Sequence, residues 1–370
     1  MFFDPKITPP VVMVVNGEKK TVWGDRNVQA HYEALWAQRD QFDTQQKLMV
    51  NAYRHTMTPE QLACNAVDAL SRTFWADVDN AVIRSRDTVK GMEIVNDLMQ
   101  VQTTLSIGKT AKLYTVDGDI AEDVSISMDG QAPFSFDHTD YDSDGDPIPV
   151  FSAGFGVNWR HAAGLQSVGI DLVLDSQEAK LKKFNTKLVQ YILRGSNTIQ
   201  VASYPGEGLM NHRNTKKINL AAGGANIDLT TATPAQIIAF FGTGAFGQTA
   251  EANEVDAYDV LWVSPQIMAN LMQPYIVNGV ISGNVMNAIM PFVPVKEFRK
   301  SFALSGNEFL GYVRRRDVVS PLVGMTTGIN ALPRPLPNVN YNFQILNATG
   351  ISVKKDGAGR GDVVYGANLT

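Results

Sequence analysis

Residues 105–136 constrain the fold most strongly, because they predict extended β structure with little apolar surface to build a core. Val124, Ile126 and Met128 alternate with serines, and this period of two is typical of a strand with one apolar face. Turn dipeptides such as Asp117-Gly118 interrupt the pattern, as in β-hairpins. An isolated two-stranded ribbon is only marginally stable in water. This segment is therefore expected to pack either on its own subunit or on another one.

An acidic stretch, residues 140–147, follows this β segment. Asp140, Asp142 and Asp144 have the spacing of the first half of a calcium-binding loop. The twelfth position of such a loop needs a bidentate carboxylate, and here it is Phe151. Two interpretations remain, a weak cation site and a solvated acidic loop tip, and the missing ligand favours the loop tip.

The clearest predicted helix covers residues 175–194. Asp175-Ser176-Gln177-Glu178 resembles a capping box at its start, and Gly195 stands where a glycine commonly ends a helix. The apolar side chains repeat at intervals of three and four residues, which predicts one buried face: Leu181, Phe184, Leu188 and Ile192. At 1.5 Å per residue the helix is about 30 Å long.

The remaining patterns predict a mixture of helices and short strands. Residues 1–26, with three prolines, predict an irregular arm with apolar contacts. Helices are expected at 27–55, 58–70, 92–100 and 234–242, and from Pro265 onward. Strands are expected at 260–263, 309–314, 318–323, 341–351 and 363–365.

Composition narrows the class of protein. The chain has 370 residues, 44% hydrophobic and 19% charged, which is ordinary for a globular protein of two or three domains. A formal net charge of −5 argues against a dedicated nucleic-acid binder. We find no membrane span and no secretory signal pattern. Cys64 is the only cysteine, so an intramolecular disulfide is excluded. We expect either a reducing compartment or a protein that does not depend on redox.

The sequence shows no assembled catalytic site. None of the five histidines pairs with another at metal-ligand spacing, so a surface or locally hydrogen-bonded role is expected for each, including His212. Residues 107–110 end like a phosphate-binding loop, but the glycine required five residues before Gly108 is Thr103. We therefore expect no catalytic residues, no cofactor and no metal, and we favour a structural protein over an enzyme.

The order of the predicted parts resembles the tailed-phage major capsid proteins of the HK97-like shell fold, which encapsulin nanocompartments share. The resemblance spans roughly residues 95–368. It is carried by these segments in this order: Pro147-Ile148-Pro149-Val150-Phe151, Asn158-Trp159-Arg160, Arg194-Gly195-Ser196, Gly208-Leu209-Met210-Asn211 and Val260 to Met272.

This resemblance implies an α+β fold with named parts. These are an N-terminal arm and first helix (1–57), a helical part of the peripheral domain (58–108), an extended β E-loop (109–155), the rest of the peripheral domain with its spine helix at 175–194 (156–221), an α/β axial domain (222–331) and C-terminal strands that return to the peripheral domain (332–370). Contacts between subunits are expected from the E-loop and from the segment after it: Val124, Ile126, Met128, Phe134, Phe136, Trp159 and Arg160.

The resemblance also implies a function. The chain would be a major capsid protein that assembles in the host cytoplasm into hexamers and pentamers of an icosahedral virion. It would enclose double-stranded DNA without reading its sequence, and its partners would include scaffolding, portal and decoration proteins. Three alternatives stay open: an encapsulin-type shell protein, a soluble α+β enzyme without a recognisable motif, and another virion part such as a decoration or tail protein.

Overall fold

The computed structural model describes most of the chain, in two compact units. The described residues are 11–15, 18–22, 26–53, 78, 81, 89–117, 141–158, 172–201, 203–277, 280–334 and 339–369. Unit 1 is formed by residues 1–110, 148–190 and 322–350. Unit 2 is formed by residues 111–147, 191–321 and 351–370. Each unit thus joins stretches that are far apart in the sequence.

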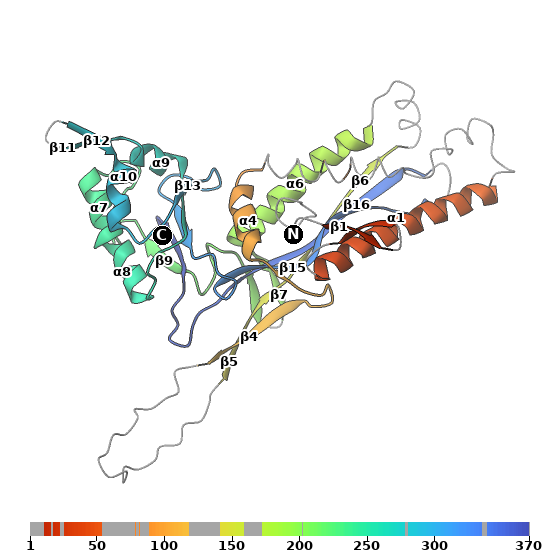
Figure 1. Ribbon diagram of the computed structural model, residues 1–370, viewed down its shortest axis with the longest axis horizontal. Helices are drawn as coiled ribbons and strands as arrows, with labels where there is room; N and C mark the ends of the chain where they lie inside the picture. The colour runs from red at the N-terminus through yellow and green to blue at the C-terminus, as the bar shows by residue number, and fades with distance from the viewer. Residues whose placement is uncertain are drawn as a thin grey trace, which may run out of the picture. The chain divides into compact units, whose positions relative to one another are not determined.

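Unit 1 contains a four-stranded sheet with the strand order β3-β15-β16-β6 (Figure 1). β6 pairs antiparallel with β16, and β3 pairs parallel with β15. The elements are β1 (Val11–Val15), β2 (Glu18–Val22), α1 (Arg26–Tyr53), α4 (Met92–Leu98), the 3-10 helix η1 (Met99–Val101), β3 (Thr103–Thr104), β6 (Val150–Val157), α6 (Leu172–Arg194), β15 (Val319–Ala331) and β16 (Tyr341–Val353). The last residues of α6 and β16 and the first of β15 belong to unit 2.

Helix α6 confirms the helix expected at 175–194 and begins three residues earlier. All four side chains of its predicted apolar face are buried: Leu181, Phe184, Leu188 and Ile192. Gln177, in its first turns, is also buried and donates a hydrogen bond to the carbonyl of Val78 at 2.8 Å. The period of the apolar residues therefore identified the buried side of this helix correctly.

The N-terminal segment differs from its prediction. In place of an irregular arm, β1 and β2 form an antiparallel hairpin that pairs Val11 with Val22 and Val15 with Glu18. The valine-rich run of β1 has high strand propensity, and Asn16-Gly17 between the strands is a hairpin dipeptide. The prediction gave more weight to the prolines. Helix α1 confirms the helix expected at 27–55, while the helix expected at 58–70 lies outside the described residues.

Unit 2 is built on a five-stranded mixed sheet with the order β13-β10-β14-β17-β9. β10 runs parallel to β13 and antiparallel to β14, and β17 runs parallel to β9. The elements are β4 (Ala111–Asp117), β5 (Tyr141–Pro147), β7 (Gly195–Val201), β8 (Tyr204–Glu207), β9 (Lys216–Asn219), α7 (Pro234–Gly242), α8 (Ala245–Ala252), β10 (Val260–Val263), α9 (Pro265–Leu271), β11 (Pro274–Val277), β12 (Val280–Asn284), α10 (Val285–Ile289), the 3-10 helix η2 (Met290–Phe292), β13 (Phe298–Lys300), β14 (Phe309–Tyr312) and β17 (Val363–Ala367).

An aromatic cluster, which we call the phenylalanine core, joins the helices of unit 2 to this sheet. Its members are Phe240, Phe241, Phe246 and Phe309. The ring of Phe309 on β14 lies 5.8 to 6.2 Å from the other three ring centroids. β10 is buried along its whole length, as its continuously apolar sequence predicted. α7 and α9 begin at the predicted positions, and Ser264 caps α9 by accepting from the backbone N–H of Ile267.

The end of the chain is divided between the two units. Most of β16 lies in unit 1, whereas β17 pairs with β14 and β9 in the sheet of unit 2. The prediction groups residues 332–370 in one domain, but these pairings place their last strand in the same sheet as β10, from the segment 222–331. Which strands pair is a long-range property that no local pattern in the sequence encodes.

β4 and β5 form an antiparallel two-stranded ribbon, with Ala111 opposite Pro147 and Asp117 opposite Tyr141. Residues 118–140 lie outside the described part of the chain. The prediction of an acidic loop tip is therefore wrong from residue 141 onward, because residues 141–147 form strand β5. Among the described residues, no helix is both long and apolar enough to cross a membrane.

Candidate functional site

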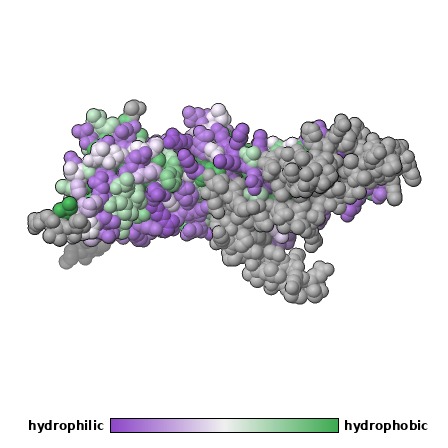
Figure 2. Space-filling view, turned by 90° about the horizontal axis from the view of Figure 1, so that it is seen from above, coloured by the Kyte–Doolittle hydropathy of each residue, from purple (hydrophilic) through white to green (hydrophobic). Residues whose placement is uncertain are grey.

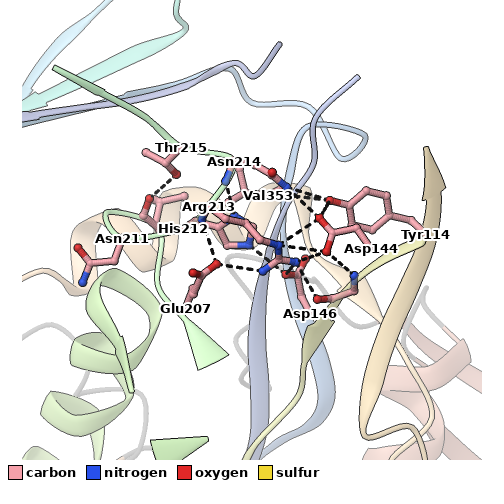
Figure 3. A network of polar contacts seen from close by, with 12 residues as sticks. Tyr114, Asp144, Asp146, Glu207, Asn211, His212, Arg213, Asn214, Thr215 and Val353 are labelled. Carbon is pink, nitrogen blue, oxygen red and sulfur yellow. Dashed lines mark hydrogen bonds and ion pairs between the residues drawn. The ribbon is translucent and has the colours of Figure 1, made fainter. Parts of the chain in front are cut away.

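A cluster of polar side chains fastens the base of the ribbon to the rest of unit 2 (Figure 3). We call it the base cluster. Its members come from β4, β5, β8 and the segment after β8: Tyr114, Asp144, Asp146, Glu207, His212, Arg213 and Asn214. It holds β4 and β5, the part of the ribbon that the structure describes.

The segment that supplies three of these side chains is anchored on the end of α6. Residues 209–211 donate hydrogen bonds to the carbonyls of residues 192–194, with distances of 2.8, 2.8 and 3.0 Å. These are carbonyls in the last turn of α6, which lack partners within the helix. Gly195 then leaves the helix with φ of +70°, and a Cβ there would lie 2.4 Å from the carbonyl oxygen of Gly206. Only glycine allows this exit and this close approach.

Arg213 is the centre of the base cluster. Its Nη2 lies 2.5 Å from Oδ1 of Asp144, 2.9 Å from Oδ1 of Asp146 and 2.8 Å from the carbonyl oxygen of Gly145. Its Nε donates to Asp144 at 3.1 Å, and its Nη1 donates to Glu207 at 3.0 Å. One guanidinium thus binds three carboxylates and a backbone carbonyl, which uses the fixed fork of donors that arginine presents.

The far side of Asp144 is held by neutral donors. The hydroxyl of Tyr114 donates to Oδ2 of Asp144 at 2.8 Å, and Nδ2 of Asn214 lies 3.3 Å from the same oxygen. Nδ2 of Asn214 also donates to the carbonyl of Val353 at 2.8 Å. The cluster therefore ties the ribbon to β16 as well as to the segment after β8.

The pKa values in the cluster follow from these contacts. Burial raises the pKa of Asp144, but hydrogen bonds from Arg213, Tyr114 and the backbone of Gly145 outweigh burial and bring its pKa to about 2. Burial, and then the hydrogen bond to Asp144, raises the pKa of the Tyr114 hydroxyl. Burial disfavours the charged form of Arg213, but the carboxylates of Asp144 and Asp146 more than compensate and raise its pKa. Asp144 and Arg213 are therefore charged at neutral pH and Tyr114 is protonated.

His212 and Asp146 form a pair that solvent does not reach. Their side chains are 1% and 2% exposed, and Nε2 of His212 lies 2.9 Å from Oδ1 of Asp146. The backbone N–H of Asn214 donates to Nδ1 of His212 at 3.2 Å. Because Nδ1 accepts a hydrogen bond, the neutral ring carries its proton on Nε2 and donates it to Asp146. The local hydrogen bond expected for His212 is present, from the backbone of Asn214. The ring is not on the surface, however, and its second partner, Asp146, is 66 positions away in the sequence.

The sequence contained a signal for this site that the prediction did not use. Asp144 and Asp146 are two residues apart in a strand, so they share one face, and Gly145 between them leaves room for Leu113. Because the prediction places these acidic residues in a turn, it makes no use of their alternation along a strand. His212, Arg213 and Asn214 follow the quoted Gly208-Leu209-Met210-Asn211 segment directly, but nothing local indicated that they would reach β5.

The predicted site residues fall into two groups, those outside the described residues and those in β5. The expected contact residues and one of the three candidate cation ligands lie outside the described residues: Val124, Ile126, Met128, Phe134, Phe136, Trp159, Arg160 and Asp140. Asp142 lies in β5. Asp144 is buried, and its carboxylate accepts hydrogen bonds from Arg213 and Tyr114. Among the described residues, no group of three or more His, Cys, Asp or Glu side chains is arranged to hold a metal ion.

The geometry of the base cluster suits it to attach the ribbon to the neighbouring elements. Its central atoms face one another, and buried charges with several hydrogen bonds fix the relative orientation of the elements that carry them. The base cluster therefore fixes the orientation of β4 and β5 relative to β8 and the segment after it, through Arg213, Asp144 and Asp146.

Comparison with known proteins gives a family and a fold. The family model DUF6260, described as a family of unknown function, matches residues 65–366. No curated protein matches the sequence. The capsid of Myoviridae phage XM1 superposes with a TM-score of 0.51 at 14% identity, covering 73% of this chain and 90% of that one. The virus-like particle from Pyrococcus furiosus gives 0.49 at 13%, with 80% and 99% covered, and Mycobacterium phage Bobi gives 0.49 at 13%, with 74% and 91% covered.

The likeness to the phage XM1 capsid confirms the fold that the order of the sequence segments predicted. It covers 90% of that chain, and the described elements of this protein form an α+β architecture. The protein has the HK97-like capsid fold and belongs to the DUF6260 family.

Proposed function

We propose that this protein is a structural subunit that assembles with copies of itself into a closed shell. The fold carries the proposal, through its likeness to the phage XM1 capsid over 73% of the chain. Subunits of a closed shell must make heterologous contacts that form rings. An element that cannot bury its own apolar residues is suited to make such contacts, because a second copy can cover them.

The ribbon has the properties that this role requires. β4 and β5 form a sheet of two strands with no third strand among the described residues, and such a sheet is marginal by itself. Its base is nevertheless fixed by the buried ion pairs of Arg213 with Asp144 and Asp146. Residues 118–140 carry the apolar alternation at Val124 to Met128. We infer that a rigid base aims this apolar segment at a neighbouring copy.

The finer assignment is a major capsid protein of a tailed phage. In this assignment residues 109–155 form the E-loop, α6 is the spine helix of the peripheral domain and residues 222–331 form the axial domain. The contacts between subunits would involve Val124, Ile126, Met128, Phe134, Phe136, Trp159 and Arg160. The shell would be a virion that encloses double-stranded DNA, built with scaffolding, portal and decoration proteins.

An encapsulin-type shell is the second candidate, because such shells share the HK97-like fold that this protein has. The content of purified particles separates the two candidates. DNA and a portal at one vertex support the phage assignment, whereas a protein cargo without DNA supports the compartment.

An enzyme is disfavoured by the burial of the base cluster, although its residues include a histidine paired with an aspartate. His212 and Asp146 are almost completely buried, so a dissolved substrate has no access to them. A second polar group lines a cavity of ≈ 270 Å³ in unit 2. Its charges are paired internally, with Arg315 on Asp362 at 2.9 Å and Arg360 on Asp356 at 2.6 Å. We propose a non-enzymatic role.

Negative-stain electron microscopy of the expressed full-length protein tests the proposal. We expect closed icosahedral particles, either from the protein alone or when it is co-expressed with the neighbouring scaffold and protease genes. A stable monomer at high concentration under both conditions would contradict a shell function.

A second experiment tests the role of the ribbon. Residues 119–139 are replaced by a two-residue Asn-Gly turn, which keeps the pairing of Asp117 with Tyr141 and leaves the base cluster intact. We expect a folded subunit with an unchanged circular dichroism spectrum that no longer forms closed shells. Normal shells from this variant would show that the ribbon does not join the subunits.

A further inference from the structure

Helix α6 carries three lysines along one exposed edge, which we call the lysine stripe: Lys180, Lys183 and Lys187. Lys183 and Lys187 are exposed and Lys180 is half-buried. They occupy positions i, i+3 and i+7, so with 3.6 residues per turn they fall within about 60° of one another around the helix. At 1.5 Å per residue the stripe is about 10 Å long. The buried face of α6, around Leu181 and Leu188, lies to one side of it.

No carboxylate among the described residues neutralises the charges of the lysine stripe. In the part of the chain that the structure describes, no ion pair involves any of the three lysines, and Nζ of Lys187 contacts only Oε1 of Gln190, at 3.4 Å. Helix α6 has five basic and two acidic residues, a net charge of +3, in a chain whose formal net charge is −5. Its one described acidic side chain, Glu178, lies toward the opposite edge, near Lys182. The stripe is therefore a local positive surface on an acidic protein.

The surroundings of the lysine stripe indicate the kind of partner. The exposed residues of α6 within the described part are polar or small: Glu178, Ala179, Lys182, Lys183, Thr186, Lys187, Gln190 and Arg194. Figure 2 shows hydrophilic residues over much of the part of the surface that is not grey. A protein interface needs a buried apolar centre with aromatic anchors, and the exposed residues of α6 within the described part include none. A polyanion backbone needs only correctly spaced positive charges.

We propose that the lysine stripe of α6 contacts the phosphate backbone of double-stranded DNA, without reading its sequence. Duplex DNA carries a negative charge about every 1.7 Å along its axis, so a stripe about 10 Å long faces several phosphates at once. Flexible lysine side chains suit such contacts, because each acts as a mobile point charge and no fixed base position has to be met. The source of the DNA, a genome enclosed by the shell, rests on the proposed function, whereas the affinity for duplexes does not.

The test compares DNA binding by the wild-type full-length protein and the variant Lys180→Gln/Lys183→Gln/Lys187→Gln. Fluorescence anisotropy with a labelled 30-base-pair duplex measures the association constant over about 50 to 200 mM NaCl. Removing three phosphate contacts should reduce the slope of log K against log salt by about 2.7, and should weaken binding at the lowest salt at least about tenfold. Circular dichroism and gel filtration confirm that the variant keeps its fold and its assembly state.

A matched control removes the same charge from exposed lysines elsewhere in unit 1, with Lys47→Gln/Lys90→Gln/Lys109→Gln. This control variant should retain most of the wild-type slope of log K against log salt. Equal losses in the two triple variants, or an unchanged slope in the stripe variant, would overturn the proposal. Loss of binding to poly-glutamate with unchanged DNA binding would assign the stripe to an acidic protein and would also overturn it. Micrographs of the same samples keep this outcome separate from shell formation, because the stripe variant should assemble normally.

Discussion

Two regions of unit 2 are stabilised by different kinds of interaction, one apolar and the other charged. The five-stranded sheet and its helices pack around the phenylalanine core, whose ring contacts require mainly the correct volume and shape. The ribbon is attached through the base cluster, where one guanidinium meets three carboxylates. Apolar packing is nearly independent of direction and of pH, whereas a charged network depends on both.

The difference follows from what each region can bury. The sheet brings helices and strands together over a large apolar surface, so burial alone stabilises it. The ribbon base has no such surface, and Leu113 on β4 is 61% exposed. Its position is set by hydrogen bonds with fixed geometry. A projecting element that must point in one direction is better fixed by directional bonds than by apolar contact, and three changes to the chain would test this contrast.

The largest effect is expected in the phenylalanine core. Phe309→Ala should lower the free energy of unfolding by about 3–5 kcal/mol, because it removes a fully buried ring and leaves a cavity. Urea unfolding followed by circular dichroism measures the change. Phe292→Ala is the control, since this side chain is 66% exposed, and it should cost less than about 0.5 kcal/mol. Equal losses in the free energy of unfolding from the two substitutions would show that the phenylalanine core does not stabilise unit 2.

Arg213→Met should have the next largest effect, about 2–3 kcal/mol at neutral pH. It leaves the buried carboxylate of Asp146 without its cation, but the partial exposure of Arg213 moderates the loss. Arg315→Met removes a bond of similar length to Asp362 at a side chain that is 57% exposed, so it should cost less than about 1 kcal/mol. Denaturation curves of the two variants side by side provide the measurement. A ranking in the reverse order would mean that the base cluster is not the main attachment.

Acid should weaken the base cluster through Asp144. The pKa of Asp144 falls from 3.8 to about 2 on folding, so its contribution is complete above about pH 4 and is lost as the pH falls toward 2. The expected loss is about 2 kcal/mol. Asp144→Asn should flatten this part of the stability–pH curve, whereas Phe309→Leu should lower the whole curve without changing its slope. An unchanged acid slope in Asp144→Asn would contradict the assignment.

The sequence predicted well wherever the signal was local and periodic. The apolar stripe of α6, the Gly195 stop, the Ser264 cap of α9 and the continuously buried strand β10 were all read from neighbouring residues. The order of these parts was enough to identify the fold, because the order of elements is itself a property of the sequence.

The candidate site was not predicted, because its parts are brought together only by folding. Asp146 and His212 are 66 positions apart, and Tyr114 and Asn214 are 100 apart. The acidic alternation in β5 was visible in the sequence, but without Arg213 beside it a solvated turn was an equally good reading. The N-terminal hairpin was missed for another reason: prolines in the arm were weighed above the valine run of β1 and the Asn16-Gly17 turn dipeptide.

The sequence by itself determined where several helices begin and end, that β10 is buried, which face of α6 is buried and in which order the parts of the fold occur, because each of these depends on interactions within a few residues. Only the tertiary structure decided that β17 lies between β14 and β9 in the sheet and that Arg213 reaches Asp144 and Asp146. Those contacts link residues far apart in the chain, and burial then removes the competing water, so that one arrangement of the charges becomes more stable than the alternatives.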